Sequence, residues 1–459
     1  MSEGLFDGVL AAGPVAELVG DRAWVQAMLD FEAALALASA ATGVIPAEAA
    51  AVIESCCHAE QYDVAALGAA AVGIGNPAGP LVRALTARVT PEAAAYVHLG
   101  ATSQDVLDTA AMLVTARALT ALRADLHACA DRLAQLAQEH AETVLAGRSL
   151  LQQAPPVTFG LTAAGWLGGV VAALDRIDVI LRDRLAVQFG GAVGTLAALR
   201  GKGSQVSSEL TRRLGLAEPV LPWHTERSRI AEVAGVLGQT SGAVAKIARD
   251  ITLLAQTEIA EVLEQGPPGS GGSSTMPHKR NPVAAVLAVG SAAQAPGLVA
   301  TLLGTAAHEH QRAAGSWHAE WRPLIELLRS TGSAAHWLRV CLDRLRIDAQ
   351  RMRADIDSSG GRLLAEHVAI ELVSASRGAV GRQEAGDLVA ECCRQAEATA
   401  TDLADVLATD PVIAKFLNRS RIGELLEPAG YLGSTQEFIR RALRDRQSRL
   451  RPPAAQGER

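Results

Sequence analysis

A long stretch of the chain, residues 109–146, contains neither glycine nor proline, and its leucines recur at steps of three and four residues. Leu113, Leu119, Leu122 and Leu126 belong to this pattern. Such steps place side chains on one face of an α-helix. The pattern therefore predicts a helix of up to about 38 residues, roughly 57 Å long at 1.5 Å per residue.

Four more helical stretches follow the first. The same pattern predicts them over about 157–187, about 227–264, from 283 onwards, and about 325–356. Each would have an apolar stripe that it cannot bury alone, which indicates a central bundle of five long helices.

Shorter helical patterns lie on either side of this bundle. Glycine and proline interrupt the first hundred residues repeatedly, and Gly360-Gly361 opens a last region that ends in a polar tail. We therefore expect an all-α protein with three helical domains. They are an N-terminal domain over 1–108, the long-helix bundle over 109–356, and a C-terminal domain over 357–459 whose tail is disordered.

Composition narrows the class of protein. Apolar residues make up 49 % of the chain but aromatic residues only 3 %, which suits closely packed, alanine-rich helices. The net charge of −7 comes from interleaved acidic and basic residues, so we expect no nucleic-acid partner. The six cysteines lack the C-x-x-C spacing of zinc or dithiol sites. The start of the chain lacks the pattern of a signal peptide, and we find no run of about 18 apolar residues. We expect a cytoplasmic protein without membrane contact.

One short segment, residues 269–283, differs from any core helix. It combines three glycines with the adjacent hydroxyls of Ser273 and Ser274, the cation of Lys279 and the amide of Asn281. Glycines favour a mobile loop, and the polar groups suit an anionic small molecule. A flexible surface connector is the alternative interpretation.

The order of residues 272–282, Gly-Ser-Ser-Thr-Met-Pro-His-Lys-Arg-Asn-Pro, resembles the signature loop of the aspartase/fumarase superfamily. In that superfamily the first serine of the pair is the catalytic base, and it corresponds to Ser273. The three-domain layout with five long helices is also similar. The resemblance implies a homotetramer with a twenty-helix core, in which each active site draws loops from three chains.

A second polar segment, residues 96–105, precedes the first long helix and reads Tyr-Val-His-Leu-Gly-Ala-Thr-Ser-Gln-Asp. Free N–H groups at a helix N-terminus bind anions, although hydroxyls placed there also serve as helix caps. The segment resembles the first substrate-binding region of the superfamily. The resemblance makes Thr102 and Ser103 candidates for binding a substrate carboxylate. His98 is a further candidate, with a structural role as its alternative.

A third segment, residues 147–156, resembles the second substrate-binding region, which reads Thr-His-x-Gln in many lyases of the superfamily. It makes Ser149 and Gln152 substrate-binding candidates. Leu150 stands in place of the histidine, and Val286 stands in place of the glutamate with which that histidine pairs. Joint replacement by apolar residues removes a buried polar pair without leaving one member unsatisfied. It indicates a branch with different acid chemistry.

That branch is the 3-carboxy-cis,cis-muconate cycloisomerases of the protocatechuate pathway. The resemblance covers most of the chain and includes Pro-Trp-His-Thr at 222–225 and Trp-His-Ala-Glu-Trp at 317–321. There are departures near the substrate cavity. Ser149-Leu150 replaces a Thr-Trp pair, Gln153 replaces a histidine, and Ser228 replaces an aspartate.

Two other motifs suggest cofactors at first sight. Residues 308–312, His-Glu-His-Gln-Arg, lack the H-E-x-x-H spacing of a metal site, and side chains two positions apart on a helix do not face each other. Arg312 instead aligns with a superfamily arginine that binds substrate carboxylate. Residues 73–78 loosely match a dinucleotide fingerprint but contain a proline, which predicts a turn. We expect neither cofactor nor metal.

Three hypotheses for function remain open at this stage. The first is a cycloisomerase that interconverts 3-carboxy-cis,cis-muconate and 4-carboxymuconolactone through an aci-carboxylate intermediate, with a small di- or tricarboxylate as substrate. The second is a C–N lyase of the superfamily that releases fumarate from a substituted succinate of the adenylosuccinate or nitrosuccinate type. The third is a helical scaffold without catalytic activity, against which the set Ser273, Lys279 and Asn281 argues.

Overall fold

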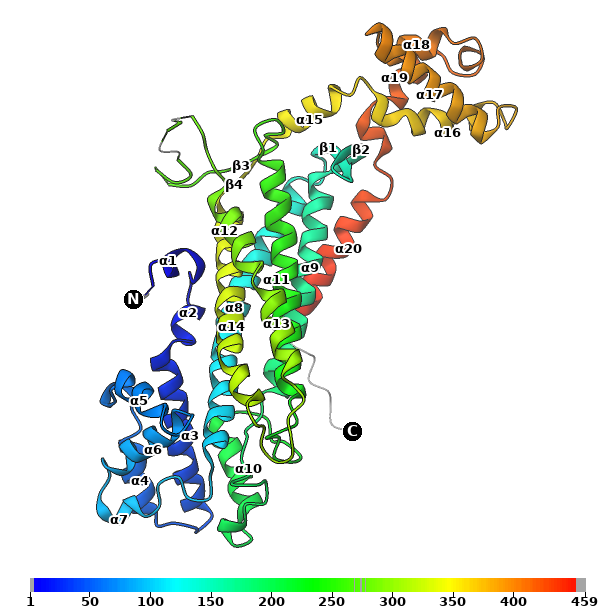
Figure 1. Cartoon of the computed structure of the whole chain (residues 1–459). Coiled ribbons are helices and arrows are strands. Elements are labelled where there is room, and N and C mark those ends of the chain that lie inside the picture. Colours follow the sequence, from blue (N-terminus) through cyan, green and yellow to red (C-terminus); the bar gives the residue numbers. More distant parts are fainter. Residues whose placement is uncertain (1–3, 268, 273–274, 277, 451–459) are drawn as a thin grey trace. The chain divides into compact units, whose positions relative to one another are not determined.

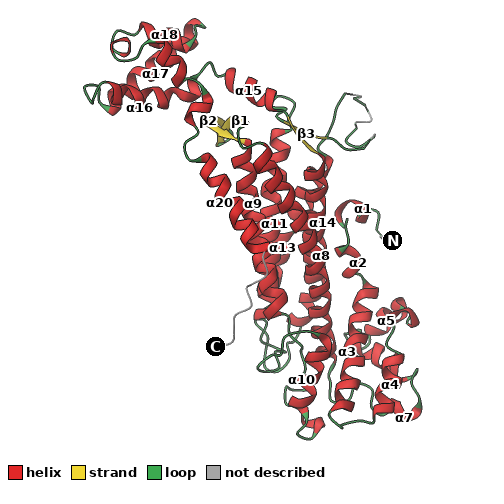
Figure 2. Ribbon diagram, turned by 180° about the vertical axis from the view of Figure 1, so that it is seen from behind, coloured by secondary structure: helices red, strands yellow, loops and turns green. Residues whose placement is uncertain are grey.

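The computed structural model describes residues 4–267, 269–272, 275–276 and 278–450. Within them helices dominate, and the four strands form two antiparallel two-stranded sheets (Figure 2). The all-α class is therefore confirmed.

By contacts between residues the chain divides into two units, here called the first and the second. The division into three domains at residues 108 and 356 stays a prediction. The first unit comprises Met1–Ala128, Ala172–Ala248 and Ala284–Val340, and the second Cys129–Val171, Arg249–Val283 and Cys341–Arg459.

The long helices run side by side (Figure 1). They are α8 (Ser103–Glu139), α9 (Phe159–Val179), α11 (Ser228–Leu254) and α14 (Ser316–Arg344), with α12 (Val283–Ala292) and α13 (Ala295–Gly304) as the fourth predicted stretch. The apolar steps of three and four residues explain why these segments are helical. A short π-helical turn, Ile180–Arg184, extends α9.

Each of the four short strands overlaps a segment where the periodicity predicts helix. Helix α8 ends at Glu139, and β1 (Val144–Ser149) pairs with β2 (Gln152–Thr158), whose two prolines are tolerated on an edge strand. Helix α11 ends at Leu254 and not near residue 264, since β3 (Val262–Glu264) pairs with β4 (Leu345–Ile347). Backbone pairing thus overrides the local helical pattern, between neighbouring segments in the β1–β2 hairpin and between distant segments in the β3–β4 sheet.

The helices of the first unit approach each other closely because small residues line their contacts. Oγ of Ser241 on α11 lies 2.9 Å from Oγ1 of Thr331 on α14. A Cβ added to Gly238 on α11 would stand 3.0 Å from Cγ2 of Val299 on α13. Such close packing is possible because the chain is rich in alanine and poor in aromatic residues.

The N-terminal part of the first unit consists of shorter helices, among which α3 packs against α4 and α10. A turn at 72–77 confirms the interpretation of the Gly-rich motif there. The helices of this part are α1 (Asp7–Leu10), α2 (Val15–Leu18), α3 (Asp21–Ala41), α4 (Ala47–Ser55), α5 (Val64–Ala71), α6 (Ala78–Thr86) and α7 (Pro91–Ala94), and α10 (Gly203–Leu214) comes from later in the chain.

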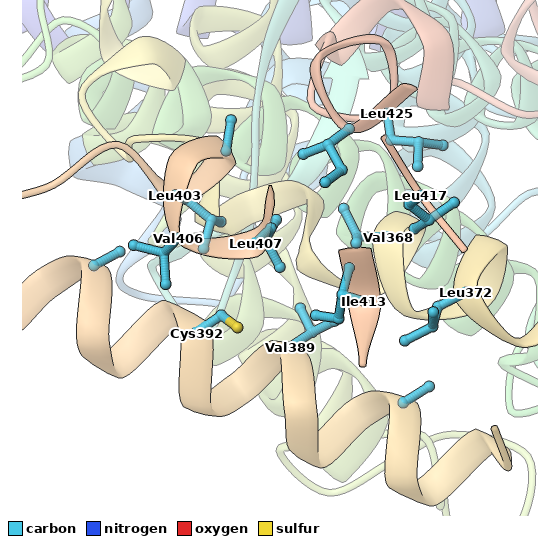
Figure 3. Close-up of a cluster of buried hydrophobic side chains, with 14 of the residues drawn as sticks. Val368, Leu372, Val389, Cys392, Leu403, Val406, Leu407, Ile413, Leu417 and Leu425 are labelled. Atoms are coloured by element: carbon cyan, nitrogen blue, oxygen red, sulfur yellow. The ribbon is translucent and has the colours of Figure 1, made fainter. Parts of the chain in front are cut away.

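The end of the second unit has an apolar core of its own, in which Val368, Leu372, Val389, Ile413 and Leu425 are buried (Figure 3). The core residues come chiefly from α16 (Ala365–Ala375), α17 (Arg382–Thr399), α18 (Leu403–Thr409) and α19 (Arg419–Leu425). The second unit also contains α20 (Thr435–Leu450) and α15 (Ala349–Asp357), which occupies the end of the predicted fifth long helix.

One helical stretch in the described part, Val283–Gly304, is long and apolar enough to pass a length-and-composition test for a membrane span. One such stretch is weak support for a membrane protein, because core helices pass the same test. This stretch consists of two helices, α12 and α13.

Candidate active site

In the first unit the candidate residues gather at the start of α8, where Asp105 is completely buried. Thr102 lies three residues earlier, just before the helix. Its backbone N–H donates to the Asp105 carboxylate at 3.0 Å, as in one half of a capping box. The other donors to Asp105 come from a distant loop. They are Nε2 of His224 at 2.7 Å, Nε2 of Gln188 at 3.2 Å, and the N–H groups of Gly190 at 3.0 Å and Gly191 at 2.8 Å.

A buried ion-pair network lies one helical turn further along α8. The guanidinium of Arg227 binds both carboxylate oxygens of Asp108, at 2.8 and 3.1 Å, and both oxygens of Glu320, at 2.5 and 3.1 Å. The indole of Trp317 donates to Asp108 at 3.0 Å. Two carboxylates around one cation fix the relative positions of α8, α11 and α14 within this unit.

Arg312 reaches the same helix start but has different partners. Its Nη1 donates to Oε1 of Gln104 at 3.0 Å, and its Nη2 donates to the carbonyl of Ala192 at 2.9 Å. Both acceptors are neutral, whereas Arg227 is surrounded by carboxylates. The positive charge of Arg312 is therefore held at Gln104, the residue after Ser103, without a compensating carboxylate from these two partners, which suits the binding of an anion.

His98 occupies a left-handed backbone conformation, with φ at 61°. Its Nδ1 lies 2.6 Å from Oε1 of Glu32, which is buried in α3. Burial disfavours the imidazolium, but the Glu32 carboxylate outweighs this effect and raises the pKa of His98 above its usual range. The protonated imidazole is therefore more stable here than in a free histidine.

In the second unit, Ser149 and Gln152 face each other as the last pair of the β1–β2 hairpin. Arg148, the preceding residue, donates from both terminal nitrogens to Glu261, at 2.8 and 2.9 Å. Glu261 is completely buried just before β3, and burial raises its pKa although Arg148 opposes the rise. The ion pair ties the hairpin to the segment that leads into the Gly/Ser-rich loop.

Ser273 lies outside the described residues. Of the other loop candidates, Lys279 is exposed and its N–H donates to the carbonyl of Met276 at 3.1 Å. Asn281 is bound to the carbonyl of Gly271 through its backbone N–H at 2.9 Å and its side-chain amide at 3.1 Å. Gly271 has φ at 71°, and a Cβ there would stand 2.6 Å from the carbonyl oxygen of Asn281. Position 271 of this loop therefore requires a glycine.

The candidates divide between the two units. His98, Thr102, Ser103 and Arg312 belong to the first unit, and Ser149, Gln152, Lys279 and Asn281 belong to the second. Sequence patterns did not reveal the supporting residues, because their partners are far apart in the chain. Within the described residues no group of three potential metal ligands occurs. Nε2 of His308 lies 3.1 Å from Oε1 of Glu320, in a geometry that makes no hydrogen bond.

Sequence reasoning did not single out the supporting residues Glu32, Gln104, Asp105, Asp108 and Glu261. One local signal was available for Asp105, since a carboxylate three residues after a helix-capping Thr is a capping-box pattern. The others are recognised only by contacts.

Fold and site together define an enzyme-like helical protein with buried ion pairs, and a guanidinium held by neutral oxygens, at the start of its longest helix. Residues 10–297 match the family described as "Lyase", and residues 361–442 match "Adenylosuccinate lyase C-terminus". The chain belongs to this lyase family, within the aspartase/fumarase superfamily.

Particular relatives extend over almost the whole chain. A 3-carboxy-cis,cis-muconate cycloisomerase of Pseudomonas aeruginosa is 46 % identical over 442 residues, which cover 96 % of this chain and 95 % of the relative. A nitrosuccinate lyase of Streptomyces davaonensis is 42 % identical, covering 96 % and 95 %. The crystal structure of 3-carboxy-cis,cis-muconate lactonizing enzyme from Pseudomonas putida superposes with a TM-score of 0.90 at 43 % identity, covering 97 % and 99 %.

Proposed function

We propose that this protein is a cycloisomerase that interconverts 3-carboxy-cis,cis-muconate and 4-carboxymuconolactone. The observation that carries the proposal is Arg312, whose guanidinium is held by two neutral oxygens beside the polar start of α8. A cation held in this way suits a substrate carboxylate. Several full-length relatives with 44–46 % identity are named as cycloisomerases of this kind, which supports the substrate.

The proposed reaction rearranges one molecule. A carboxylate oxygen of the substrate adds to a carbon of the double bond, and the electron pair moves onto the adjacent carbon and its carboxylate. The hydroxyl of Ser273 then gives its proton to that carbon, and a proton from solvent restores the hydroxyl; the reverse reaction follows the same steps backwards. Because no electron is gained or lost, the chemistry calls for no redox cofactor.

The other residues would bind and stabilise charge. Arg312, Thr102 and Ser103 would hold one carboxylate near the N–H groups at the start of α8. Lys279 and Asn281 would stabilise the serine oxyanion and a second carboxylate, since a free serine hydroxyl is too weak an acid. His98, Ser149 and Gln152 would complete the contacts to the substrate.

The experiment measures consumption of 3-carboxymuconate and, in parallel, release of fumarate. The purified protein should consume 3-carboxymuconate in an ultraviolet assay, and Ser273→Ala should abolish that activity. Ser270→Ala, on the same loop, is the matched control and should stay active. Full activity of Ser273→Ala would remove Ser273 from the mechanism.

A second candidate function is supported by the nitrosuccinate lyase relative at 42 % identity. In that case the same groups would expel a nitrogen substituent from a substituted succinate. Fumarate release without any consumption of 3-carboxymuconate would select this lyase.

We also propose that the protein is a cytoplasmic homotetramer. Helices α12 and α13 form an apolar stretch that is only one-third buried, and Val286 and Leu303 are 50 % and 51 % exposed. Contiguous exposed apolar surface favours association. Light scattering should give a tetramer, and Val286→Glu should weaken it; a monomeric wild-type protein would contradict the proposal.

A further inference from the structure

A pocket of about 280 Å³ lies between two neighbouring short helices of the first unit, α5 and α6 (Figure 1). Ala66, Leu67 and Ala70 line it from α5, and Pro80 and Ala84 line it from α6. Leu67 and Pro80 are buried, whereas the alanine side chains are too short to fill the space, so a hollow with apolar walls remains. No candidate active-site residue that the structure describes lines this pocket.

Two arginines and a tyrosine complete the lining of the pocket. Arg83 lies on α6, and Arg88 follows the end of that helix. The guanidinium of Arg88 lies 4.7 Å from the ring centroid of Tyr62, and its Nη2 donates to the carbonyl of Gln61. Stacking on the ring and this hydrogen bond hold the Arg88 guanidinium at the pocket.

The charges of the two arginines are not balanced by the rest of the lining. Within the described residues the side chain of Arg83 has no hydrogen-bond or ion-pair partner, and Arg88 forms no ion pair. Asp63 supplies the one carboxylate among the described lining residues, and its Oδ1 accepts the Ala66 N–H at 3.0 Å as the cap of α5. Two guanidinium groups against one carboxylate leave the pocket with a net positive charge.

Two other pockets of the chain differ in charge. Arg382 and Glu366 line an apolar pocket between α16 and α17, where one positive charge meets one negative charge. A pocket along α17 is lined by three carboxylates and one guanidinium, so it is negative. A surplus of positive charge over an apolar hollow therefore distinguishes the α5–α6 pocket from these two.

We propose that the α5–α6 pocket binds a small carboxylate with an apolar body, such as a benzoate. A guanidinium binds a carboxylate through two parallel hydrogen bonds, and no described residue occupies the N–H groups of Arg83. The alanine and leucine side chains then cover the apolar body of the ligand. The volume lies just below the usual range of about 300–1,000 Å³ for ligand pockets, which suits a small molecule. The pocket is a binding site beyond the proposed function.

The test is a fluorine NMR titration of the full-length protein with 4-fluorobenzoate. It uses the Arg312→Gln background, so that binding at the candidate active site contributes little. We expect a Kd of about 1 mM or tighter, as for other small fragments. Arg83→Gln should raise this Kd about tenfold or more, because it removes a charged donor. Acetate has the carboxylate but no ring, so it should displace the probe at least about tenfold less well than benzoate.

Two control variants in the same background separate the pocket from other effects. Ala70→Leu keeps every charge and fills the hollow from an exposed position of α5, so it should raise the Kd about tenfold. Arg382→Gln removes an arginine from the charge-balanced pocket between α16 and α17, and should leave the Kd unchanged. The unfolding temperature of each variant shows whether it is folded.

The outcomes decide the inference without any measurement of activity. No binding of 4-fluorobenzoate, or an equal Kd after Arg83→Gln, would overturn it. An unchanged Kd for Ala70→Leu would place the probe outside the hollow and would overturn it as well. Because the titration measures binding alone, a failure of the proposed function would leave these results as they are.

Discussion

Nδ1 of His98 lies 2.6 Å from Oε1 of Glu32, so a residue with a left-handed backbone is tied to a carboxylate buried in α3. The other oxygen of Glu32 is buried and has no hydrogen-bond partner in the described part of the chain. Burial opposes protonation of the imidazole, but Glu32 raises the pKa of His98 overall. The folded protein therefore holds the imidazole proton more tightly than the unfolded chain does.

We expect Glu32→Gln to destabilise the protein by about 1–3 kcal/mol at pH 6 and by less at pH 9. The folded-state pKa of His98 is raised, so its contribution is fully present below the unfolded pKa of about 6.5. It is lost as the pH rises through the folded-state pKa. Urea unfolding at both pH values measures the difference.

The control for this experiment lies on the same helix. Asp30 binds Arg117 at 2.6 Å, and this pair contains no histidine. Asp30→Asn should therefore change the free energy of unfolding by the same amount at pH 6 and pH 9. An equally constant effect of Glu32→Gln would show that His98 does not titrate against Glu32.

Removal of the Asp105 carboxylate should have a larger effect on stability. Asp105→Ala leaves the buried donors of His224 and Gln188 without their acceptor, and we expect a loss of about 3–5 kcal/mol. Asp105→Asn keeps one acceptor oxygen and should cost less. Urea unfolding checks both, with Asp183→Ala as a surface control that changes stability by less than about 1 kcal/mol. Similar values for Asp105→Ala and Asp183→Ala would contradict the prediction.

The helices were predictable because their signal is local, whereas the β3–β4 pairing and the ion pairs depend on distant segments. The leucine steps of residues 109–146 identify α8, although it begins at Ser103 and ends at Glu139. The β1–β2 hairpin carries no Asn-Gly signal, since its turn is Leu150-Leu151. Candidate site residues came from motif resemblance, but no spacing rule links Arg227 to Asp108 and Glu320.

Arg312→Gln should lower kcat/KM for a carboxylate substrate about 10–100-fold, mostly through a higher KM. The change removes a cation whose two partners, Gln104 and Ala192, are neutral. Arg312→Lys should recover part of the loss, because it restores the charge but not the planar fork. Steady-state kinetics check this, with Arg329→Gln on α14 as the control. An unchanged KM in Arg312→Gln would exclude Arg312 from substrate binding.

The ion pair of Arg148 and Glu261 should affect stability in a pH-dependent way, unlike surface ion pairs. Glu261 is completely buried, and burial raises its pKa even with Arg148 beside it. Without Arg148 the pKa of Glu261 should rise further, because the opposing cation is gone. A carboxylate with a raised folded-state pKa destabilises the protein as the pH increases.

We therefore expect Arg148→Met to cost about 3–5 kcal/mol at pH 8 and less at pH 5, where the unpaired Glu261 can take up a proton. Adding Glu261→Gln should recover part of the loss, since no unpaired charge is then buried. Arg353→Met, which breaks a half-exposed pair with Glu427, should cost less than about 1 kcal/mol. Urea unfolding of wild type, Arg148→Met, Glu261→Gln and the double variant measures the coupling. If Arg148→Met cost no more at pH 8 than at pH 5, Glu261 would not be charged in the folded protein.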